Sequence, residues 1–183
     1  MNVLILDRDG VINQDSDQFI KSAAEWQPIT NSLQAIADLS THCHIVVATN
    51  QSGLARGLFN KIDLDQMHQK MKTLIKEKGG RIDGIYYCPH APDAHCDCRK
   101  PKAGLMYQIL DQYPNHQAID VFVVGDSLRD LEAAQVAKMQ PVLVKTGKGQ
   151  KTLKQIAATD LADVPVFENL YSFSQTYIKN LCA

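Results

Sequence analysis

The sequence contains no long apolar run and no excess of charge of one sign. Its longest hydrophobic stretches are well short of the roughly 18 residues that a membrane span needs. The 19 basic and 20 acidic side chains give a formal net charge of −1, so the basic excess typical of nucleic-acid-binding proteins is missing. The first residues lack the charged region of a signal peptide. We therefore expect a cytoplasmic protein that binds neither membranes nor nucleic acids.

Repeats, low-complexity tracts and interdomain linkers are also missing from the 183 residues. With 45% hydrophobic residues, the chain is long enough to bury a substantial core. These features predict a single domain over residues 1–183. We expect that domain to be a monomer.

Strand-like and helix-like segments alternate along the chain. Apolar runs predict buried strands at Val3–Leu6, His44–Ala48, Gly84–Tyr87, Val121–Val124 and Pro141–Lys145. Apolar residues at helical spacing lie between these runs and again near the C-terminus. This alternation is typical of a three-layer, Rossmann-like α/β fold with a mostly parallel sheet.

Two local features of this pattern give specific predictions. Asp63 and Gln66 have the spacing of a capping box, so the second helix should begin at Asp63. The glycine-containing and lysine-containing segment Gly147–Lys151 should form a mobile loop at most.

In sheets of this kind, ligands bind beyond the carboxyl ends of the strands. The residues that follow the carboxyl ends of the expected strands are suited to binding phosphate and metal ions. These residues are Asp7 and Asp9, Thr49–Gln51, the cysteine-rich segment with Arg99–Lys100, and Gly125–Asp126. Because Asp7 and Asp9 are two residues apart, their carboxylates share a face of a continuing strand and crowding raises one pKa. This pair favours Mg²⁺-assisted phosphoryl transfer, with one aspartate as nucleophile and one as general acid and base.

Three of the five cysteines crowd into residues 88–98. Three thiolates and one imidazole in this segment match tetrahedral Zn²⁺ in a closed structural site. The candidate ligands are Cys88, His90, Cys96 and Cys98. His95 is a rival ligand, and a disulfide or free thiols are the alternative to zinc.

The expected role of zinc is structural, because protein ligands fill all four positions and leave none for water. The metal should stiffen a loop with little core of its own and place Arg99 and Lys100 beside the substrate. The remaining cysteines, Cys43 and Cys182, are expected to be inert thiols.

Four motifs occur in the order Asp7–Val11, Thr49–Asn50, Lys100, and Gly125–Asp126 with Asp130. In these motifs and their order, the chain resembles the haloacid dehalogenase (HAD) superfamily of phosphohydrolases. The resemblance implies that Asp7 attacks phosphorus, while Asp9 protonates the leaving group and then activates water. It implies that Thr49 and Lys100 bind the phosphoryl oxygens. Mg²⁺ would be held by Asp7, the backbone carbonyl of Asp9, and Asp126.

Within that superfamily, the zinc loop and the following Arg99–Pro101 resemble two families, the heptose bisphosphate phosphatases and the histidinol-phosphate phosphatases. The first resemblance spans nearly the whole chain and includes Ser52–Gly57, while the short zinc loop also fits the second. The first implies hydrolysis of the 7-phosphate of a heptose 1,7-bisphosphate, for nucleotide-activated heptose and the lipopolysaccharide core. The second implies histidinol phosphate as substrate. A phosphate-binding module without turnover is a third hypothesis, which the presence of both Asp7 and Asp9 disfavours.

The resemblance to the heptose enzymes also implies a set of substrate contacts. They are Asp15, Ser16, Asp17, Gln18, Asn50, Gln51, Ser52, Arg99 and Ser127. A bisphosphate needs a second anion site, and Arg99 is the expected ligand because a guanidinium suits a phosphate fork. The chain lacks room for a large cap domain, so residues 13–27 and the zinc loop should shape access to the site.

Overall fold

The structure is a computed structural model that describes residues 1–181, so Cys182 lies outside the described residues. Its six-stranded sheet has parallel pairing throughout. The strands are β1 (Asn2–Leu6), β2 (Cys43–Asn50), β3 (Gly84–Cys88), β4 (Phe122–Gly125), β5 (Gln140–Val144) and β6 (Val166–Phe167). Their spatial order is β3-β2-β1-β4-β5-β6. The order reverses between β1 and β4, which is where ligands bind in sheets of this kind.

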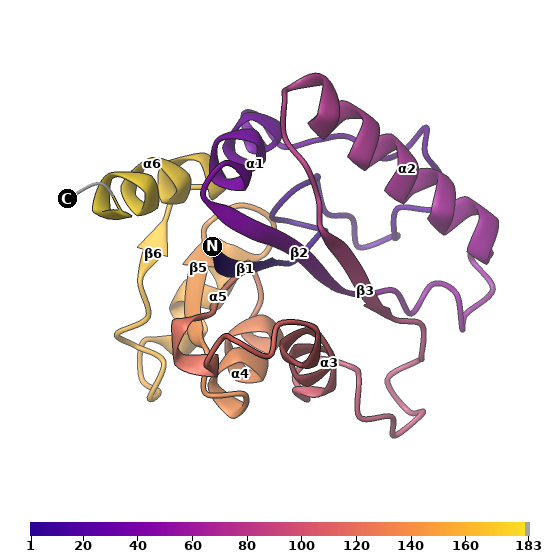
Figure 1. Cartoon of the computed structure of the whole chain (residues 1–183). Coiled ribbons are helices and arrows are strands. Elements are labelled where there is room, and N and C mark those ends of the chain that lie inside the picture. The colour runs from indigo at the N-terminus through magenta and orange to yellow at the C-terminus, as the bar shows by residue number, and fades with distance from the viewer. Residues whose placement is uncertain (182–183) are drawn as a thin grey trace.

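Helices cover both faces of the sheet and form the predicted three layers (Figure 1). One face carries α1 (Ser32–Ser40), α2 (Lys61–Glu77) and α6 (Leu170–Leu181), and the other carries α3 (Gly104–Gln112), α4 (Leu128–Val136) and α5 (Gly149–Ile156). Successive residues of a strand point to opposite faces. Accordingly Leu4 and Leu6 belong to the core under α1, α2 and α6, whereas Val3 and Ile5 belong to the core under α3 and α4. The predicted fold class is confirmed.

The start of α2 differs from the prediction. The helix begins at Lys61, and Asn60 is its N-cap. The Asp63 backbone N–H donates to the Asn60 side chain at 3.0 Å, and the Asp63 carboxylate accepts from the Asn60 N–H at 2.9 Å. The prediction that Asp63 caps the helix was therefore wrong, because Asp63 is the third-position partner of a capping box that starts three residues earlier.

The prediction of a loop over Gly147–Lys151 was also wrong, since α5 begins at Gly149. Only Thr152 and Ile156 of its later residues are buried, so the apolar stripe was too short to recognise. Long-range contacts fix the helix instead: the Thr152 hydroxyl donates to the Asp126 carbonyl at 2.8 Å. Strand β6, only two residues long, was not predicted either.

The connection from β1 to α1, residues 7–31, contains only the isolated bridges Asp9–Asn13 and Asn13–Pro28 and no helix or longer strand. This described segment therefore holds no cap domain, as expected. Among residues 1–181, no helix has both the length and the apolar character needed to cross a membrane.

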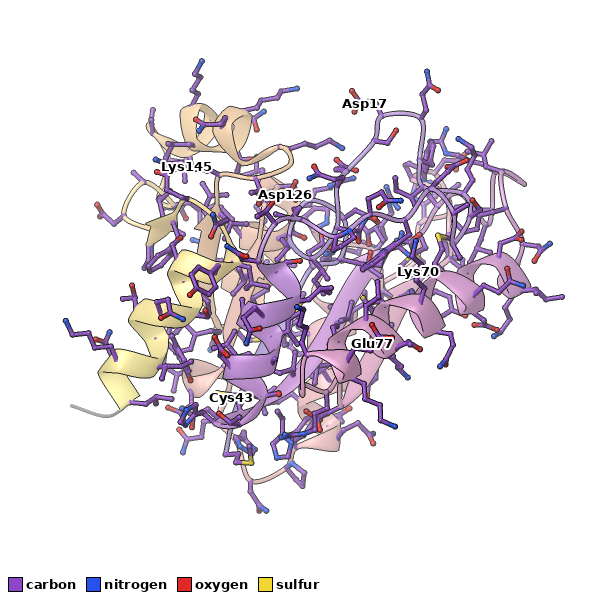
Figure 2. All side chains as sticks on the ribbon, turned by 90° about the horizontal axis from the view of Figure 1, so that it is seen from above. Asp17, Cys43, Lys70, Glu77, Asp126 and Lys145 are labelled. Atoms are coloured by element: carbon purple, nitrogen blue, oxygen red, sulfur yellow. The ribbon has the colours of Figure 1, made fainter. Side chains whose placement is uncertain are left out.

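The side chains that could bind a ligand or take part in a reaction lie at the carboxyl end of the sheet. Figure 2 shows Asp126, just after β4, and Asp17 toward one end of the molecule, with Cys43 at the start of β2 at the opposite end. The parallel pairing brings the ends of β1, β2, β3 and β4 to the same edge.

Candidate active site

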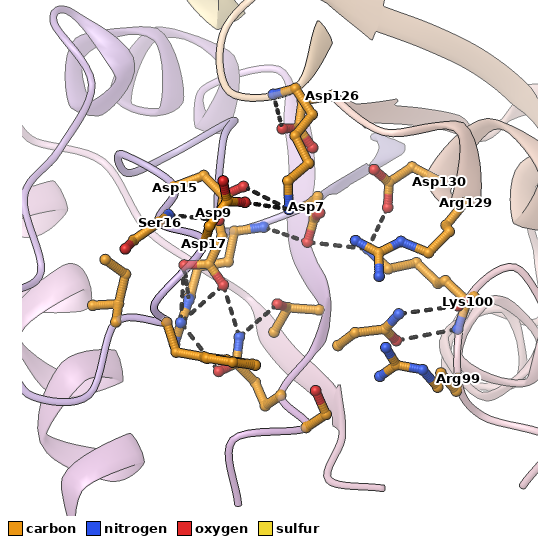
Figure 3. Close-up of a pocket in the computed structure, with 18 of the residues that line it drawn as sticks. Asp7, Asp9, Asp15, Ser16, Asp17, Arg99, Lys100, Asp126, Arg129 and Asp130 are labelled. Carbon is orange, nitrogen blue, oxygen red and sulfur yellow. Dashed lines mark hydrogen bonds and ion pairs between the residues drawn. The ribbon is translucent and has the colours of Figure 1, made fainter. Parts of the chain in front are cut away.

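Three aspartates meet in a pocket of about 320 Å³ at this edge. Asp7 directly follows β1 and its backbone N–H donates to Val124 of β4 at 2.9 Å, while Asp126 follows β4. Asp130 lies one helical turn later on α4. One carboxylate oxygen from each of the three lies within 4.8 Å of the others. Figure 3 shows these side chains converging on one region of the pocket.

Two glycines make room for the Asp126 carboxylate. Gly10 and Gly147 both have positive φ, 87° and 56°, and a Cβ on either would collide with the Asp126 side chain. The Lys148 backbone N–H also donates to Asp126 Oδ2 at 2.7 Å. The Asp126 carboxylate is therefore held in a tight backbone cradle that only residues without a side chain allow.

The negative charges of Asp7, Asp126 and Asp130 lie close together, so a bound cation would stabilise this cluster. Burial, followed by the Asp130 carboxylate, raises the pKa of Asp7 to about 7 against the lowering effect of Lys100. Burial, with Asp130 and Asp7, raises the pKa of Asp126 to about 8. Two carboxylates that resist ionisation together are the donor set that a hard divalent cation such as Mg²⁺ binds and stabilises. Asp7 and Asp126, the second of which is held in the backbone cradle described above, fit that ion.

Lys100 is the internal counter-charge of the cluster. It is only 2% exposed, and its Nζ lies 2.5 Å from Asp130 Oδ1 and 3.0 Å from Asp7 Oδ1. Burial lowers the pKa of Lys100, but the two carboxylates outweigh burial and raise it. The Asn50 side chain holds the Lys100 backbone from both sides, with its amide donating to the carbonyl and its oxygen accepting from the N–H. Lys100 is thus a fixed positive charge beside the carboxylate of Asp7.

Asp9 is held by donors on every side. Its carboxylate accepts from the buried Arg8 at 2.9 Å, from Asn13 Nδ2 at 2.8 Å and from Gln51 Nε2 at 2.9 Å. Burial raises the pKa of Asp9, but the Arg8 charge and these hydrogen bonds outweigh it and hold the pKa below its ordinary value. The pKa values of Asp7 and Asp9 are therefore shifted in opposite directions, which is the pattern of paired carboxylates with different roles.

Gln51 connects Asp9 to the predicted phosphate ligand Thr49. The same Gln51 amide nitrogen donates to Thr49 Oγ1 at 2.9 Å. Because the hydroxyl oxygen already accepts this bond, its own proton remains available to donate to a phosphoryl oxygen.

The cysteine loop has the geometry of a tetrahedral zinc site. Cys88, Cys96 and Cys98 are free thiols, with Sγ–Sγ separations of 3.6 Å from Cys96 to each of the other two. His90 Nδ1 lies 3.6 Å from Cys88 Sγ and 3.3 Å from Cys98 Sγ. The edges of a tetrahedron with ordinary Zn–S and Zn–N bonds are about 3.5–3.8 Å long. The four side chains are compatible with structural zinc, and the disulfide alternative was wrong for these three cysteines.

Zinc removal gives a testable prediction. We expect a zinc-selective chelator to lower Tm by about 5–10 °C, because the loop loses the bonds that replace a core. Differential scanning fluorimetry measures the shift, and re-addition of zinc should reverse it. A Cys98→Ser variant should already melt lower and respond little to chelator. An unchanged Tm after complete zinc removal would contradict a stabilising role.

Most of the predicted substrate residues line the pocket together. These are Asp15, Ser16, Asp17, Asn50, Gln51, Ser52 and Arg99, beside Asp7, Asp9, Thr49, Lys100 and Asp126. Gln18 and Ser127 do not line it. The Ser127 hydroxyl donates to Asp130 Oδ2 at 2.6 Å as part of the capping box of α4.

Two cations in the pocket were not singled out from the sequence. Lys148 lies 3.0 Å from Asp15 Oδ2 and so connects the β5 exit with the 15–17 segment. Arg129 lines the pocket from the first turn of α4. The available signal for Lys148 was its place shortly after a fifth predicted strand, Pro141–Lys145. For Arg129 the signal was its position between Asp126 and Asp130.

Comparison with known proteins places this geometry among sugar phosphatases. A family model described as HAD-hydrolase-like matches residues 97–172. The chain is 48% identical over 176 residues to the D-glycero-beta-D-manno-heptose-1,7-bisphosphate 7-phosphatase of Neisseria meningitidis serogroup A, covering 96% of this chain and 94% of the relative. A relative of the same name from Pseudomonas putida is 49% identical over 180 residues, covering 97% and 100%.

A solved structure of an enzyme with the same activity in its name is also similar to this chain. It is the crystal structure of D,D-heptose 1,7-bisphosphate phosphatase from B. bronchiseptica, complexed with magnesium and phosphate. The TM-score is 0.94 at 46% sequence identity, and the match covers 98% of this chain and 99% of that one.

Proposed function

The chain belongs to the D-glycero-beta-D-manno-heptose-1,7-bisphosphate 7-phosphatase family, and we propose on that basis that it removes the 7-phosphate from this bisphosphate with the help of Mg²⁺. The chain is accordingly a phosphoric monoester hydrolase of the HAD type. The relatives support the heptose substrate over histidinol phosphate, which the short zinc loop had left open. The product, a heptose 1-phosphate, suits the synthesis of nucleotide-activated heptose for lipopolysaccharide.

The charge distribution of the pocket is the observation that carries this proposal. Asp7 and Asp126 offer a cation site at one place, while Arg56, Arg99 and Arg129 line the same pocket without a carboxylate partner among the described residues. A substrate with a reacting phosphate and a second, distant phosphate satisfies both. A monophosphate leaves the arginines unpaired.

The proposed first step transfers the phosphoryl group to Asp7. Its carboxylate oxygen forms a bond to phosphorus while the bond from phosphorus to the sugar oxygen breaks. Mg²⁺, when bound, neutralises the charge of the phosphoryl oxygens and of the nucleophile. Thr49 and Lys100 bind phosphoryl oxygens, and Asp9 gives its proton to the leaving alkoxide. That step requires Asp9 first to take up a proton from solvent, against the contacts that hold its pKa low.

The second step returns the enzyme to its starting state. Asp9, now ionised, accepts a proton from a water molecule as that water attacks phosphorus. The bond between phosphorus and Asp7 breaks, and inorganic phosphate leaves. The contacts that hold the Asp9 pKa low favour the ionised form that this step needs. One carboxylate thus serves as acid and then as base.

The test is phosphate release from the heptose bisphosphate and from histidinol phosphate, each with Mg²⁺ and with EDTA. The proposal predicts Mg²⁺-dependent release with a strong preference for the bisphosphate. Preference for histidinol phosphate would overturn the substrate while keeping the chemistry. No release from either by a folded, zinc-loaded protein would contradict the proposed activity.

The acid cluster also predicts a pH-dependent effect of Mg²⁺ on stability. The pKa values of Asp7 and Asp126, about 7 and about 8 without a cation, lie above the value of about 3.9 in an unfolded chain. The folded protein then binds more protons than the unfolded chain between these values, so this cluster costs stability as pH rises. Mg²⁺ binding should relieve that cost.

We therefore expect Mg²⁺ to raise Tm by at least about 3 °C more at pH 8 than at pH 5.5. Thermal melts with and without Mg²⁺ at the two pH values measure the difference. An Asp126→Asn variant is the matched control and should lose most of the difference between the Mg²⁺ effects on Tm at the two pH values. Equal Mg²⁺ effects at both pH values would contradict a site built on these carboxylates.

We further propose that the enzyme is a cytoplasmic monomer that acts on a small, diffusible sugar phosphate, without nucleic-acid or membrane partners. The balanced charge of 19 basic and 20 acidic side chains supports the part of this proposal that concerns nucleic acids and membranes. Light scattering of the purified protein tests the monomer, and a second species at twice the mass would contradict it.

A further inference from the structure

Arg129 is a pocket cation that the proposed mechanism does not use. It occupies the second position of α4, between the capping residue Ser127 and the buried Asp130, and its side chain lines the pocket. Within residues 1–181, no carboxylate lies at ion-pair distance from it and no side-chain hydrogen bond involves it. An exposed arginine is usually a solvated charge, so its meaning depends on what surrounds it.

Three other positively charged side chains of the pocket form ion pairs with carboxylates. Arg8 binds Asp9, Lys100 lies between Asp7 and Asp130, and Lys148 contacts Asp15. These pairs balance one another and leave little charge for a ligand. Three arginines among the described pocket residues have no carboxylate partner; they are Arg56, Arg99 and Arg129. Of these, Arg99 donates to the His90 carbonyl at 3.4 Å.

Arg99 and Arg129 come from different elements but face the same space. Figure 3 shows both guanidinium groups extending into the pocket from the side of Lys100. Both residues line the same pocket. Arg56, in contrast, lies over the Phe19 ring at 5.6 Å. Arg99 and Arg129 thus offer two guanidinium groups to one pocket without a carboxylate partner among the described residues, an arrangement suited to a phosphate.

The neighbouring Ser127 is less suited to this task. Its hydroxyl proton is used in the bond to Asp130 Oδ2, and its backbone N–H donates to the same oxygen at 3.0 Å. At the start of α4, Arg129 is therefore the side chain that remains free to contact a substrate.

We propose that Arg129 is a specificity-determining residue that binds the non-reacting phosphate of the substrate together with Arg99. This inference rests on the proposed function and deepens it. It assigns to Arg129, rather than to Ser127, the substrate contact from α4. The reacting phosphate stays with Thr49 and Lys100, so Arg129 selects bisphosphates over monophosphates.

The experiment compares kcat/KM for the heptose 1,7-bisphosphate and for the corresponding heptose 7-phosphate. In Arg129→Gln, we expect kcat/KM for the bisphosphate to fall about 10–100-fold, as for the loss of one or two charge-assisted hydrogen bonds. The preference for the bisphosphate over the monophosphate should fall at least about tenfold. Arg129→Lys keeps the charge but loses the fork, so its preference should lie between those of wild type and Arg129→Gln.

Lys151→Gln is the matched control, because Lys151 is an exposed cation of the neighbouring helix α5 that does not line the pocket. Its bisphosphate preference should match that of wild type. An equal loss on both substrates in Arg129→Gln, or no loss on either, would overturn the inference. If wild-type protein releases no phosphate from the bisphosphate, the proposed function itself fails, which is a distinct result.

Discussion

Replacement of Asp7 by asparagine should lower kcat for the heptose bisphosphate by about 10⁴-fold or more. The variant lacks the carboxylate that forms the bond to phosphorus, and loss of a covalent nucleophile has effects of this size. It also lacks one of the two carboxylates that fit the cation. Steady-state phosphate release, with a correction for traces of wild-type enzyme, measures the loss.

The same substitution should not lower the stability of the metal-free protein. Because burial and Asp130 raise the pKa of Asp7 to about 7, its negative charge is unfavourable in the folded state near neutral pH. Asparagine removes that charge, so Tm without Mg²⁺ should stay level or increase. Asp65→Asn, which removes an exposed partner of Lys61, is a control that should leave kcat at the wild-type value. Asp7→Asn activity above a few per cent of wild type would contradict a nucleophilic Asp7.

Replacement of Lys100 by methionine should reduce both activity and stability. The buried ammonium lies between Asp7 and Asp130, and removal of one partner from a buried ion pair costs about 3–5 kcal/mol. Without Lys100, the pKa of Asp7 should rise further, so less of the nucleophile is ionised at neutral pH. With the loss of a phosphate ligand, we expect kcat to fall about 10²–10³-fold. Chemical denaturation and a pH–rate profile measure the two effects.

Lys102→Met is the matched control for Lys100→Met. Lys102 lies two residues away and forms an ion pair with Asp97 in which both side chains are largely exposed, 52% and 96%. Exposed pairs contribute little, so this variant should change stability by less than about 1 kcal/mol. Similar losses in the two variants would show that Lys100 acts only as a surface charge of the zinc loop.

The location of the proposed catalytic side chains Asp7, Thr49 and Asp126 was predictable because each follows an apolar run. Asp7, Thr49 and Asp126 stand at the ends of β1, β2 and β4, and the parallel pairing of these strands brings them together. The cluster of Cys88, His90, Cys96 and Cys98, which could hold zinc, was predictable from composition and spacing alone. In both cases the information lies within a few neighbouring residues.

The contacts that the sequence did not reveal join residues far apart in the chain. The Thr146 hydroxyl donates to the Gly10 carbonyl at 2.6 Å, and the Lys148 N–H donates to Asp126. These bonds bring the β5 exit and α5 over the acid cluster. The arginine pair has the same origin, because Arg99 follows the zinc loop and Arg129 is the second residue of α4. No local pattern indicates that their side chains meet in one pocket.

The account is tested most directly by ³¹P NMR of the reaction with heptose 1,7-bisphosphate and Mg²⁺. It predicts that the signal of the 7-phosphate disappears, that inorganic phosphate appears in equal amount, and that the anomeric phosphate remains. That result would show that the 7-phosphate is the group that reacts and that the anomeric phosphate is spared. Loss of the anomeric phosphate, or an unchanged spectrum with folded protein, would contradict the account.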